Sequence, residues 1–476
     1  MAESQRLGGK VRAVRKSHRL TQVRLAEQLG ISPSYLNLIE HNRRPLTAQL
    51  LLKLVKLFDL DLATFASDDT DQVEHELMEV FGDELFDDQR LTRGDVEELV
   101  EHHPNVARSI RRLYDAWQSA QEQARTLAGE DGDPAVVGRR VLPSEEVSDL
   151  LQDHLNHFPD LELAAERVAA AAGFDPHRVE GALSRYLLEQ QGIQVVLRPE
   201  NQMNGALRRL DRSQRTLELA EVLHLPTRRF QLAHAIGLLT QSDTLDRLVA
   251  EAELQHPESA RLARVALANY FAAAVLMPYE PFLQAALDTR YDVDLLGHRF
   301  QVSFEQVAHR LTSLRRPGRE GVPFHLIRID IAGNISKRFS ASGIRFARYS
   351  GACPRWNVFR ALLTPGAITT QVSRMPDGES FFCLARTLRK GDRGFRSSPV
   401  VHAVGLGCRV EHAEALVYAD GIDLTSEERA VPIGVTCRLC ERRDCDQRAL
   451  PSIGQPLRVD EDVRGLSFYA EVDTSR

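Results

Sequence analysis

The stretch from Thr21 to Glu40, TQVRLAEQLGISPSYLNLIE, decides the fold of the first part of the chain. Thr21 has the short hydroxyl side chain that is favoured at a helix N-cap, so a helix is expected from Gln22 to Leu29. Gly30 can adopt the left-handed backbone conformation that ends a helix. The stretch therefore predicts a short helix followed by a tight turn.

A second short helix is expected directly after that turn. Ser32 and Pro33 are a cap and first-turn pair, which predicts a helix that runs to about His41. A further helix, capped by Thr47, is expected from Ala48 to Phe58. The residues expected in the shared core of the motif are Leu25, Leu29, Ile31, Leu36 and Ile39.

Residues 1–65 resemble the Cro/repressor-like (XRE) helix-turn-helix family. In that geometry the second helix of the motif lies in the major groove of duplex DNA, with its N-terminal side chains at the base edges. The resemblance nominates Ser34, Tyr35 and Asn37 for base contact. Gln22 suits a phosphate or a partner on the recognition helix, and the residues expected to bind phosphates are Asn42, Arg43 and Arg44. The alternative is a helical protein-interaction module with the same fold.

The charge distribution fits a nucleic-acid contact at the amino end. Met1–Ala66 contains 11 Lys and Arg against 5 Asp and Glu, a net charge of +6, whereas Ser67–Glu98 contains 2 against 13, a net charge of −11. A basic head followed by an acidic segment is typical of a DNA contact that ends sharply. Chance clustering in a solvated linker is the alternative.

The bulk composition is that of a cytoplasmic globular protein. The 476 residues suggest roughly two to four domains. Hydrophobic residues make up 43% and charged residues 27%, and no run approaches the roughly 18 apolar residues of a membrane span. The first residues lack the apolar core of a signal peptide. We therefore expect no membrane partner and no stable disulfides.

The middle of the chain is expected to be mainly helical. Ile110, Leu113 and Trp117 begin a coiled-coil-like seam in Ala107–Leu127, which can pair two subunits or pack on its own domain. A hinge is expected at Gly129–Gly138. One strand-like run, Gly192–Leu197, interrupts the helical pattern. After Val322 strands dominate, and two strands that flank Met375–Gly378 are expected to form a hairpin.

Pro226–Leu238 resembles the active-site helix of the M78 (IrrE/ImmA-like) zinc peptidases. That family carries His-Glu-x-x-His, in which two histidines bind zinc and the glutamate activates water. Here His234 remains, but Ala235 and Leu238 stand at the other two positions, and no glutamate lies within 262–271. We therefore expect a retained fold without hydrolase activity.

Arginines cluster around this segment in the sequence, and guanidinium groups suit phosphates. The alternative is that most of them lie on solvated helix faces. They are Arg208, Arg209, Arg212, Arg215, Arg228 and Arg229.

All six cysteines lie between residues 353 and 445, and Cys437, Cys440 and Cys445 form a C-x2-C-x4-C run. This spacing suits an iron–sulfur cluster of the 4Fe–4S type or a zinc ion. A fourth ligand is required, and Cys408 is the first candidate, ahead of Cys353 and Cys383. Unligated thiols are a further alternative. A zinc deaminase site with His412 and Glu414 is disfavoured, because Thr436 replaces the proline of that signature.

The three parts in this order resemble the short-chain fatty-acyl-CoA regulator family. The motifs that carry the resemblance are 31–37, Trp356–Phe359, Val417–Gly421 and the cysteine run. The resemblance implies a non-enzymatic regulator of glyoxylate-cycle or methylcitrate-cycle genes that binds an operator in double-stranded DNA, senses a short-chain acyl-CoA and carries an iron–sulfur cluster. Further candidates for binding the acyl-CoA are cations in segments that also contain aromatic residues. They are Lys337, Arg338 and Arg345. The alternative is a metal- or redox-sensing regulator of the M78 antitoxin type.

The expected fold class is therefore multidomain, with an all-α head, a mainly α metalloprotease-like middle domain and an α+β C-terminal domain. The expected domains are 1–66, a linker with a dimerisation helix at 67–140, 141–320 and 321–476. A homodimer or homotetramer is expected, because one such head reads few base pairs.

Overall fold

The computed structural model describes residues 11–12, 14–15, 20–40, 44, 46–58, 69–83, 86, 91–127, 143–173, 175, 178–347, 351–391, 398–452, 462, 464–467 and 469. The chain forms two compact units, 1–118 and 119–476, each of which is described by itself. The expected hinge at Gly129–Gly138 lies outside the described residues.

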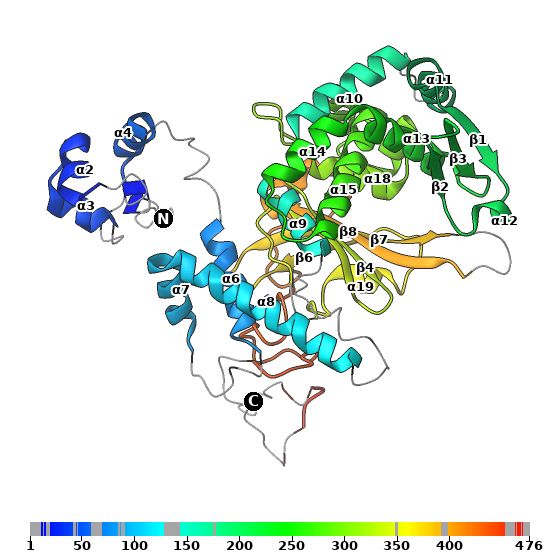
Figure 1. Ribbon diagram of the computed structural model, residues 1–476. Coiled ribbons are helices and arrows are strands. Elements are labelled where there is room, and N and C mark those ends of the chain that lie inside the picture. The colour runs from blue at the N-terminus through cyan, green and yellow to red at the C-terminus, as the bar shows by residue number, and fades with distance from the viewer. Residues whose placement is uncertain are drawn as a thin grey trace. The chain divides into compact units, whose positions relative to one another are not determined.

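The first unit begins with the expected short helices, α2 (Gln22–Leu29), α3 (Pro33–Glu40) and α4 (Ala48–Phe58) (Figure 1). The hydroxyl of Thr21 accepts a hydrogen bond from the backbone N–H of Arg24, and Gly30 ends α2 with φ of 71°. The predicted core is confirmed, except that Ile31 is only partly buried. Its buried members are Val11, Leu25, Ala26, Leu29, Leu36, Ile39, Leu50 and Leu54.

A second helical group follows, formed by α6 (Asp69–Val80), α7 (Arg93–His102) and α8 (Pro104–Leu127). Ile110 packs in the core of this group, whereas the side chain of Leu113 is 72% exposed. The aromatic ring of Trp117 lies 5.5 Å from that of Tyr114. The seam therefore points partly inward and partly to the surface.

The second unit contains a helical part around a small sheet. Strands β1 (Gln194–Arg198), β3 (Thr216–Ala220) and β2 (Arg208–Asp211) lie in that order. Only the first of these strands was expected from the sequence. The helices are α9 (Pro143–Asp153), α10 (Pro159–Ala172), α11 (Val179–Gln191), α12 (Glu200–Met203), α13 (Leu225–Thr240), α14 (Ser242–Glu251), α15 (Pro257–Leu276), α16 (Tyr279–Asp288), α17 (Val293–Phe300) and α18 (Phe304–Thr312).

The C-terminal part of this unit is built on a six-stranded sheet of order β5-β4-β8-β7-β6-β9. Strands β6 and β7 pair antiparallel across Met375–Gly378, which confirms the predicted hairpin. The sheet comprises β4 (His325–Asp330), β5 (Ile335–Ser340), β6 (Thr369–Arg374), β7 (Ser380–Lys390), β8 (Val400–Arg409) and β9 (Val431–Pro432), and the short helices beside it are α19 (Asn357–Ala361), η3 (Val410–Ala415) and η4 (Val417–Ala419).

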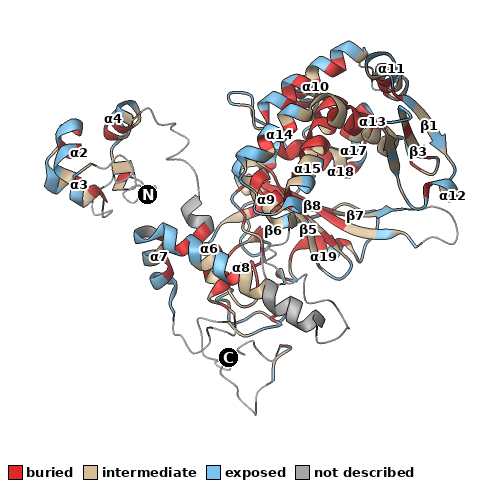
Figure 2. Ribbon diagram, viewed as in Figure 1, coloured by how far each residue is buried: buried red, intermediate tan, exposed pale blue. Residues whose placement is uncertain are grey.

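Both faces of the six-stranded sheet carry buried side chains, which belong to two separate cores. Figure 2 draws parts of this sheet in red. On one face, Leu326, Leu384 and Leu406 join the core of the helical part. On the other face, Ile327 and Ala385 pack with Val358 of α19. The alternation follows from the period of two along a strand.

Among the described helices, none reaches the length and hydropathy of a membrane span alone. Helices α15 and α16 reach them only as a pair bent by 67°.

Candidate functional site

The two helices of the amino-terminal motif are joined by the side chain of Gln22. Its Nε2 donates to Oδ1 of Asn37 at 3.2 Å and to Oε2 of Glu40 at 2.7 Å. Glu40 also accepts two hydrogen bonds from Arg15, at 2.6 and 3.0 Å. Burial would raise the pKa of Glu40, but the hydrogen bonds from Arg15 and Gln22 outweigh it and lower the pKa. The start of α2 is thereby tied to the exposed face of α3.

The side chains nominated for base contact lie differently. Ser34 and Asn37 are exposed, whereas Tyr35 is half-buried against the core of the motif. Arg44 is exposed, and Asn42 and Arg43 lie outside the described residues. The structure thus brings Gln22 and Asn37 together on one surface and leaves Ser34 free to reach a partner.

The peptidase-like helix α13 carries His234 in a buried position. Its Nδ1 lies 2.5 Å from Nη1 of Arg208, which comes from β2. Burial, and then the charge of Arg208, lowers the pKa of His234 to about 4, so the ring is neutral at pH 7. The Arg208 guanidinium thus places a fixed positive charge beside the buried imidazole of His234, which disfavours a zinc ion at the same place.

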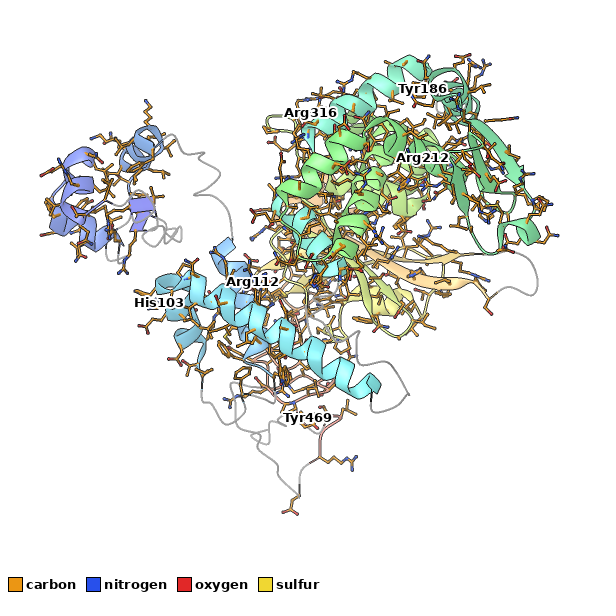
Figure 3. The ribbon with its side chains drawn as sticks, in the orientation of Figure 1. His103, Arg112, Tyr186, Arg212, Arg316 and Tyr469 are labelled. Carbon is orange, nitrogen blue, oxygen red and sulfur yellow. The ribbon has the colours of Figure 1, made fainter. Side chains whose placement is uncertain are left out.

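The other candidate arginines do not converge on one place. Arg209 pairs with Glu218 at 3.3 Å, Arg228 pairs with Glu180 at 3.1 Å, and Arg229 is buried. Arg212 and Arg215 are exposed, and Arg212 is labelled in Figure 3. Most of these cations therefore stabilise local structure or face solvent.

A cavity lies on the face of the six-stranded sheet that packs against α19. It is small, with about 20 Å³ of free volume, which is room for roughly one water molecule. Its walls are mostly apolar, so a small apolar group suits it. The lining residues are His325, Ile327, Ile344, Phe346, Trp356, Asn357, Val358, Ser373, Cys383, Gly405, Leu406 and Ile433.

The polar wall of the cavity is a pair formed by His325 and Cys383. Nδ1 of His325 lies 2.8 Å from Oγ of Ser342, and its Nε2 lies 3.5 Å from Sγ of Cys383. Burial lowers the pKa of His325 to about 3 and raises that of Cys383 to about 12. Both groups are therefore neutral at pH 7, and the thiol is a poor nucleophile.

A second feature of this domain is the loop that carries the cysteine run. Cys440 packs so closely on Gly434 that a Cβ there would lie 3.2 Å from its Sγ. The guanidinium of Arg448 donates to the carbonyl oxygens of Cys437 at 2.7 Å and Cys440 at 2.6 Å, and thereby fixes the loop. The backbone N–H of Ala449 points to Sγ of Cys437 at 3.5 Å.

Cys353, rather than Cys408, lies beside this loop. Its backbone N–H donates to the carbonyl of Val435 at 2.9 Å. Burial raises the pKa of the Cys353 thiol; the N–H groups of nearby residues lower it, and the adjacent Cys437 and Cys440 raise it further.

The structure does not bring Cys408 to the run. Cys408 pairs in register with Phe382, and both side chains lie on the sheet face that packs against the helical part. Cys353 lies on the other face. Within the described chain, no three His, Cys, Asp or Glu side chains stand close enough together to hold a metal ion.

Comparison with known families divides the chain into three matched regions. A helix-turn-helix model matches residues 11–65, the model of the IrrE N-terminal-like domain (peptidase M78) matches 188–312, and the model "Short-chain fatty acyl coenzyme A regulator, C-terminal" matches 313–469.

Similar proteins match over nearly the whole chain. A propionyl-CoA carboxylase regulator of Cereibacter sphaeroides is 40% identical over 474 residues, which is 99% of this chain and 100% of the relative. The HTH-type transcriptional regulators PrpR and RamB of Mycobacterium tuberculosis are each 38% identical and cover 98% and 97% of this chain, and 96% and 98% of their own lengths. A solved Mycobacterium tuberculosis transcriptional regulator matches with a TM-score of 0.67 and 41% identity, over 69% of this chain and all of that one.

Proposed function

The chain belongs to the short-chain fatty acyl coenzyme A regulators, and from that premise we propose that it controls genes of short-chain fatty acid metabolism by binding operator DNA and an acyl-coenzyme A. Like its relatives, it is a DNA-binding regulator of transcription, and it is not an enzyme. Genes of the glyoxylate or methylcitrate cycle are the expected targets.

The DNA contact is assigned to α3, with Gln22 supporting Asn37. The hydrogen bond between these two side chains holds the amide of Asn37 before DNA arrives, which reduces the entropy lost on binding. An amide of this kind suits the N6 and N7 edge of adenine. Ser34 and Tyr35 are the further base contacts that we propose, and Asn42, Arg43 and Arg44 are the phosphate contacts.

The single observation that carries the sensing proposal is the small apolar cavity within the region matched by the acyl-coenzyme A regulator model. A cavity of this size has room for the terminal methyl group of a short acyl chain and would exclude a long chain. Arg345 lies between two lining residues, Ile344 and Phe346, and is the proposed phosphate contact near it. Arg338 is a weaker choice, because it already pairs with Glu145.

We propose that the cysteine loop closes around an iron–sulfur cluster, with zinc as the alternative. The thiols must move together for this, because in the described part of the chain no three such side chains stand close enough to hold a metal ion. The proposed ligands are Cys353, Cys437, Cys440 and Cys445, with Cys353 in place of Cys408. The carbonyl contacts of Arg448 and the N–H group that points to Cys437 are typical of a loop that stabilises thiolates. A bound cluster or zinc ion would lock this loop against the sheet.

The cavity and the cysteine loop share one wall. Trp356 lines the cavity, and its indole N–H donates to the carbonyl of Gly434 at 2.9 Å. Ile433 also lines the cavity, and Gly434 packs against Cys440. A ligand that moves this wall would therefore change the cysteine loop, which supplies the differential contact that coupling between two sites requires.

The proposal is tested by calorimetry with acetyl-CoA and propionyl-CoA, together with binding to the chain's own promoter fragment with and without each. We expect heat of binding and a changed DNA affinity for at least one of them, and a weaker response to a long-chain acyl-CoA. Absence of heat together with unchanged DNA affinity would remove the sensing proposal.

A metal- or redox-sensing regulator is the second candidate, favoured by the approach of Cys353 to Cys437 and Cys440. An anaerobic preparation separates the assignments. A brown protein that absorbs near 400 nm carries an iron–sulfur cluster, whereas a colourless protein with bound zinc carries a structural metal. A change of DNA affinity on oxidation, without any response to acyl-CoA, would favour the redox sensor.

We propose that the chain acts as a homodimer or a homotetramer. A head of this kind reads one half-site, so two heads are needed for a specific operator. The exposed Leu113 and Val106 of α8, seven residues apart on one helix face, are the proposed contact between subunits.

A further inference from the structure

The buried carboxylate of Glu305 on α18 is surrounded by three cations from the six-stranded sheet. Nη1 of Arg328 (β4) lies 2.9 Å from its Oε1, and Nζ of Lys337 (β5) lies 3.9 Å from the same oxygen. Nζ of Lys390 (β7) pairs with Oε2. These four side chains, which we call the Glu305 cluster, carry a net charge of +2 when all are ionised.

The neighbouring acidic groups do not neutralise this excess. Asp330, on β4, is occupied by the turn that follows it, and Asp294 pairs with Arg386 at 2.6 Å. Among the groups that the structure describes around the cluster, Glu305 is thus the one carboxylate in contact with the three cations.

Two histidines face the cluster and stay neutral near pH 7. Nε2 of His309 lies 3.2 Å from Nζ of Lys337, and burial, followed by the charge of Lys337, lowers the pKa of His309 to about 3. Burial and the neighbouring cations likewise lower the pKa of His402, on β8. The histidines add hydrogen-bonding nitrogen atoms without adding charge.

The cluster is open on the side of its lysines. The side chains of Lys337 and Lys390 are 40% and 46% exposed, whereas those of Arg328 and Glu305 are 17% and 9% exposed. Like charges held this close repel one another, and an incoming anion would relieve that repulsion. Partial burial, and then the charges of Arg328 and Lys390, lower the pKa of Lys337 to about 8, an effect that a bound anion would oppose.

We propose that the Glu305 cluster binds the phosphate group of a small phosphorylated ligand. Two ammonium groups and a guanidinium make charge-assisted hydrogen bonds to phosphate oxygens. The ligand is either the nucleotide end of the acyl-CoA, in which case the inference rests on the proposed function, or a separate phosphorylated metabolite. Two exposed cations beside a buried carboxylate form too small a surface for duplex DNA.

This site is distinct from the cavity. Arg328 and Lys337 pair in register and lie on the sheet face toward α18, whereas the adjacent Ile327 lines the cavity on the other face. The two sites can therefore be tested separately.

The test is calorimetry on the full chain with adenosine 3′,5′-bisphosphate, inorganic phosphate and acetyl-CoA as probes. Lys390→Ala and Lys337→Ala are each expected to lower the affinity for the bisphosphate about tenfold, which is equivalent to the loss of one charge-assisted hydrogen bond. Arg389→Ala is the matched control, because Arg389 is exposed, precedes Lys390 and points to the other sheet face. It should leave the affinity unchanged.

A variant that is expected to increase phosphate affinity distinguishes a binding role from a simple loss of folding. Glu305→Gln removes the competing carboxylate, so it should strengthen phosphate binding, whereas a purely structural role for Glu305 predicts no gain. Thermal unfolding of each variant shows whether it is folded.

Each outcome decides the proposal. Three results would overturn it. The first is an equal loss of bisphosphate affinity in Lys390→Ala and Arg389→Ala, and the second is no binding of any phosphate probe by the wild type. The third is weaker DNA binding in the lysine variants with unchanged bisphosphate affinity. If the lysine variants bind acetyl-CoA and the bisphosphate more weakly to the same extent, the acyl-CoA is the ligand. If only the affinity for the bisphosphate falls, the ligand is a separate metabolite. If the proposed function is wrong, the DNA affinity will not change when acyl-CoA is added, whether or not the phosphate probes bind.

Discussion

Glu162 on α10 and Arg310 on α18 form a fully buried ion pair. Nη1 and Nη2 of Arg310 donate to the two carboxylate oxygens at 2.5 and 2.9 Å, and the two side chains are 0% and 1% exposed. The hydroxyl of Tyr270 on α15 also donates to Glu162 at 2.5 Å, and Nε of Arg310 donates to the carbonyl of Met277. Three helices of the peptidase-like part are thus joined by a satisfied polar network that needs no metal.

Arg310→Met should destabilise the chain by about 3 to 5 kcal/mol, because it leaves a buried carboxylate without its cation. The measurement is the free energy of unfolding in urea. Arg316→Met is the matched control, since Arg316 pairs with Glu166 where both side chains are about one third exposed. It should cost about 1 kcal/mol or less. Similar losses for the two variants would contradict a dominant role of the buried pair.

Acid should reduce the stability that this pair contributes once the pH falls below 4.5. Burial would raise the pKa of Glu162, but the charge and hydrogen bonds of Arg310 lower it below the ordinary value of 4.5. A carboxyl whose pKa is lower in the folded chain contributes stability that is present above 4.5 and is lost as pH falls through the folded value. Unfolding followed from pH 7 to pH 3 should therefore show a smaller decline in Glu162→Gln than in the wild type. Parallel curves would contradict this assignment.

Local signals in the sequence predict local structure well in this chain. The caps at Thr21 and Ser32 and the turn at Met375–Gly378 depend on residues a few positions apart, and the structure contains both features. The loss of the zinc site was also predictable, because Ala235 and Leu238 lie within one helix of His234.

Contacts between distant segments could not be predicted in the same way. Arg208 reaches His234 from a strand that the helical pattern did not indicate. Cys353 approaches Cys440 only because Trp356 and Val435 bring their two segments together. Cys408 is the cysteine nearest to the run in sequence, but the alternation of β8 directs that thiol to the opposite face.

Trp356→Phe should loosen both the cavity and the cysteine loop. It removes the donor to the carbonyl of Gly434 while it keeps an aromatic ring, so we expect a loss of about 1 to 3 kcal/mol from the unpaired buried carbonyl. Metal content and acetyl-CoA affinity should fall together. Trp117→Phe is the control, because the chain has two tryptophans and Trp117 lies in the other unit. A variant that lost neither property would separate the cavity from the cysteine loop.

Gly407→Ala should disturb the His325 side of the cavity. A Cβ at this position would lie 2.6 Å from Nε2 of His325 and 2.7 Å from the carbonyl oxygen of Phe382, so the strand or the ring must move. We expect a destabilisation of about 1 to 3 kcal/mol and weaker binding of acetyl-CoA. Gly181→Ala, in α11, meets no atom within 4 Å and should be neutral or stabilising by up to about 1 kcal/mol. Unchanged acetyl-CoA affinity in Gly407→Ala would place the acyl group elsewhere.

Asn37→Ala and Arg44→Ala should weaken DNA binding in different ways. Asn37, held by Gln22, is proposed to read a base, so its loss should reduce the preference for the operator by about 1 to 3 kcal/mol and leave the salt dependence unchanged. Arg44 is exposed and is proposed to bind a phosphate, so its loss should weaken all sequences alike and lower the salt slope by about one.

Gln22→Ala separates support of Asn37 from direct contact with DNA. If Gln22 acts only by holding Asn37, then Gln22→Ala should cost less than Asn37→Ala, and the double variant should lose no more than Asn37→Ala alone. The measurement is fluorescence anisotropy with operator and scrambled duplexes at several salt concentrations. Additive losses would mean that Gln22 contacts DNA itself, and unchanged operator preference in Asn37→Ala would remove α3 from base recognition.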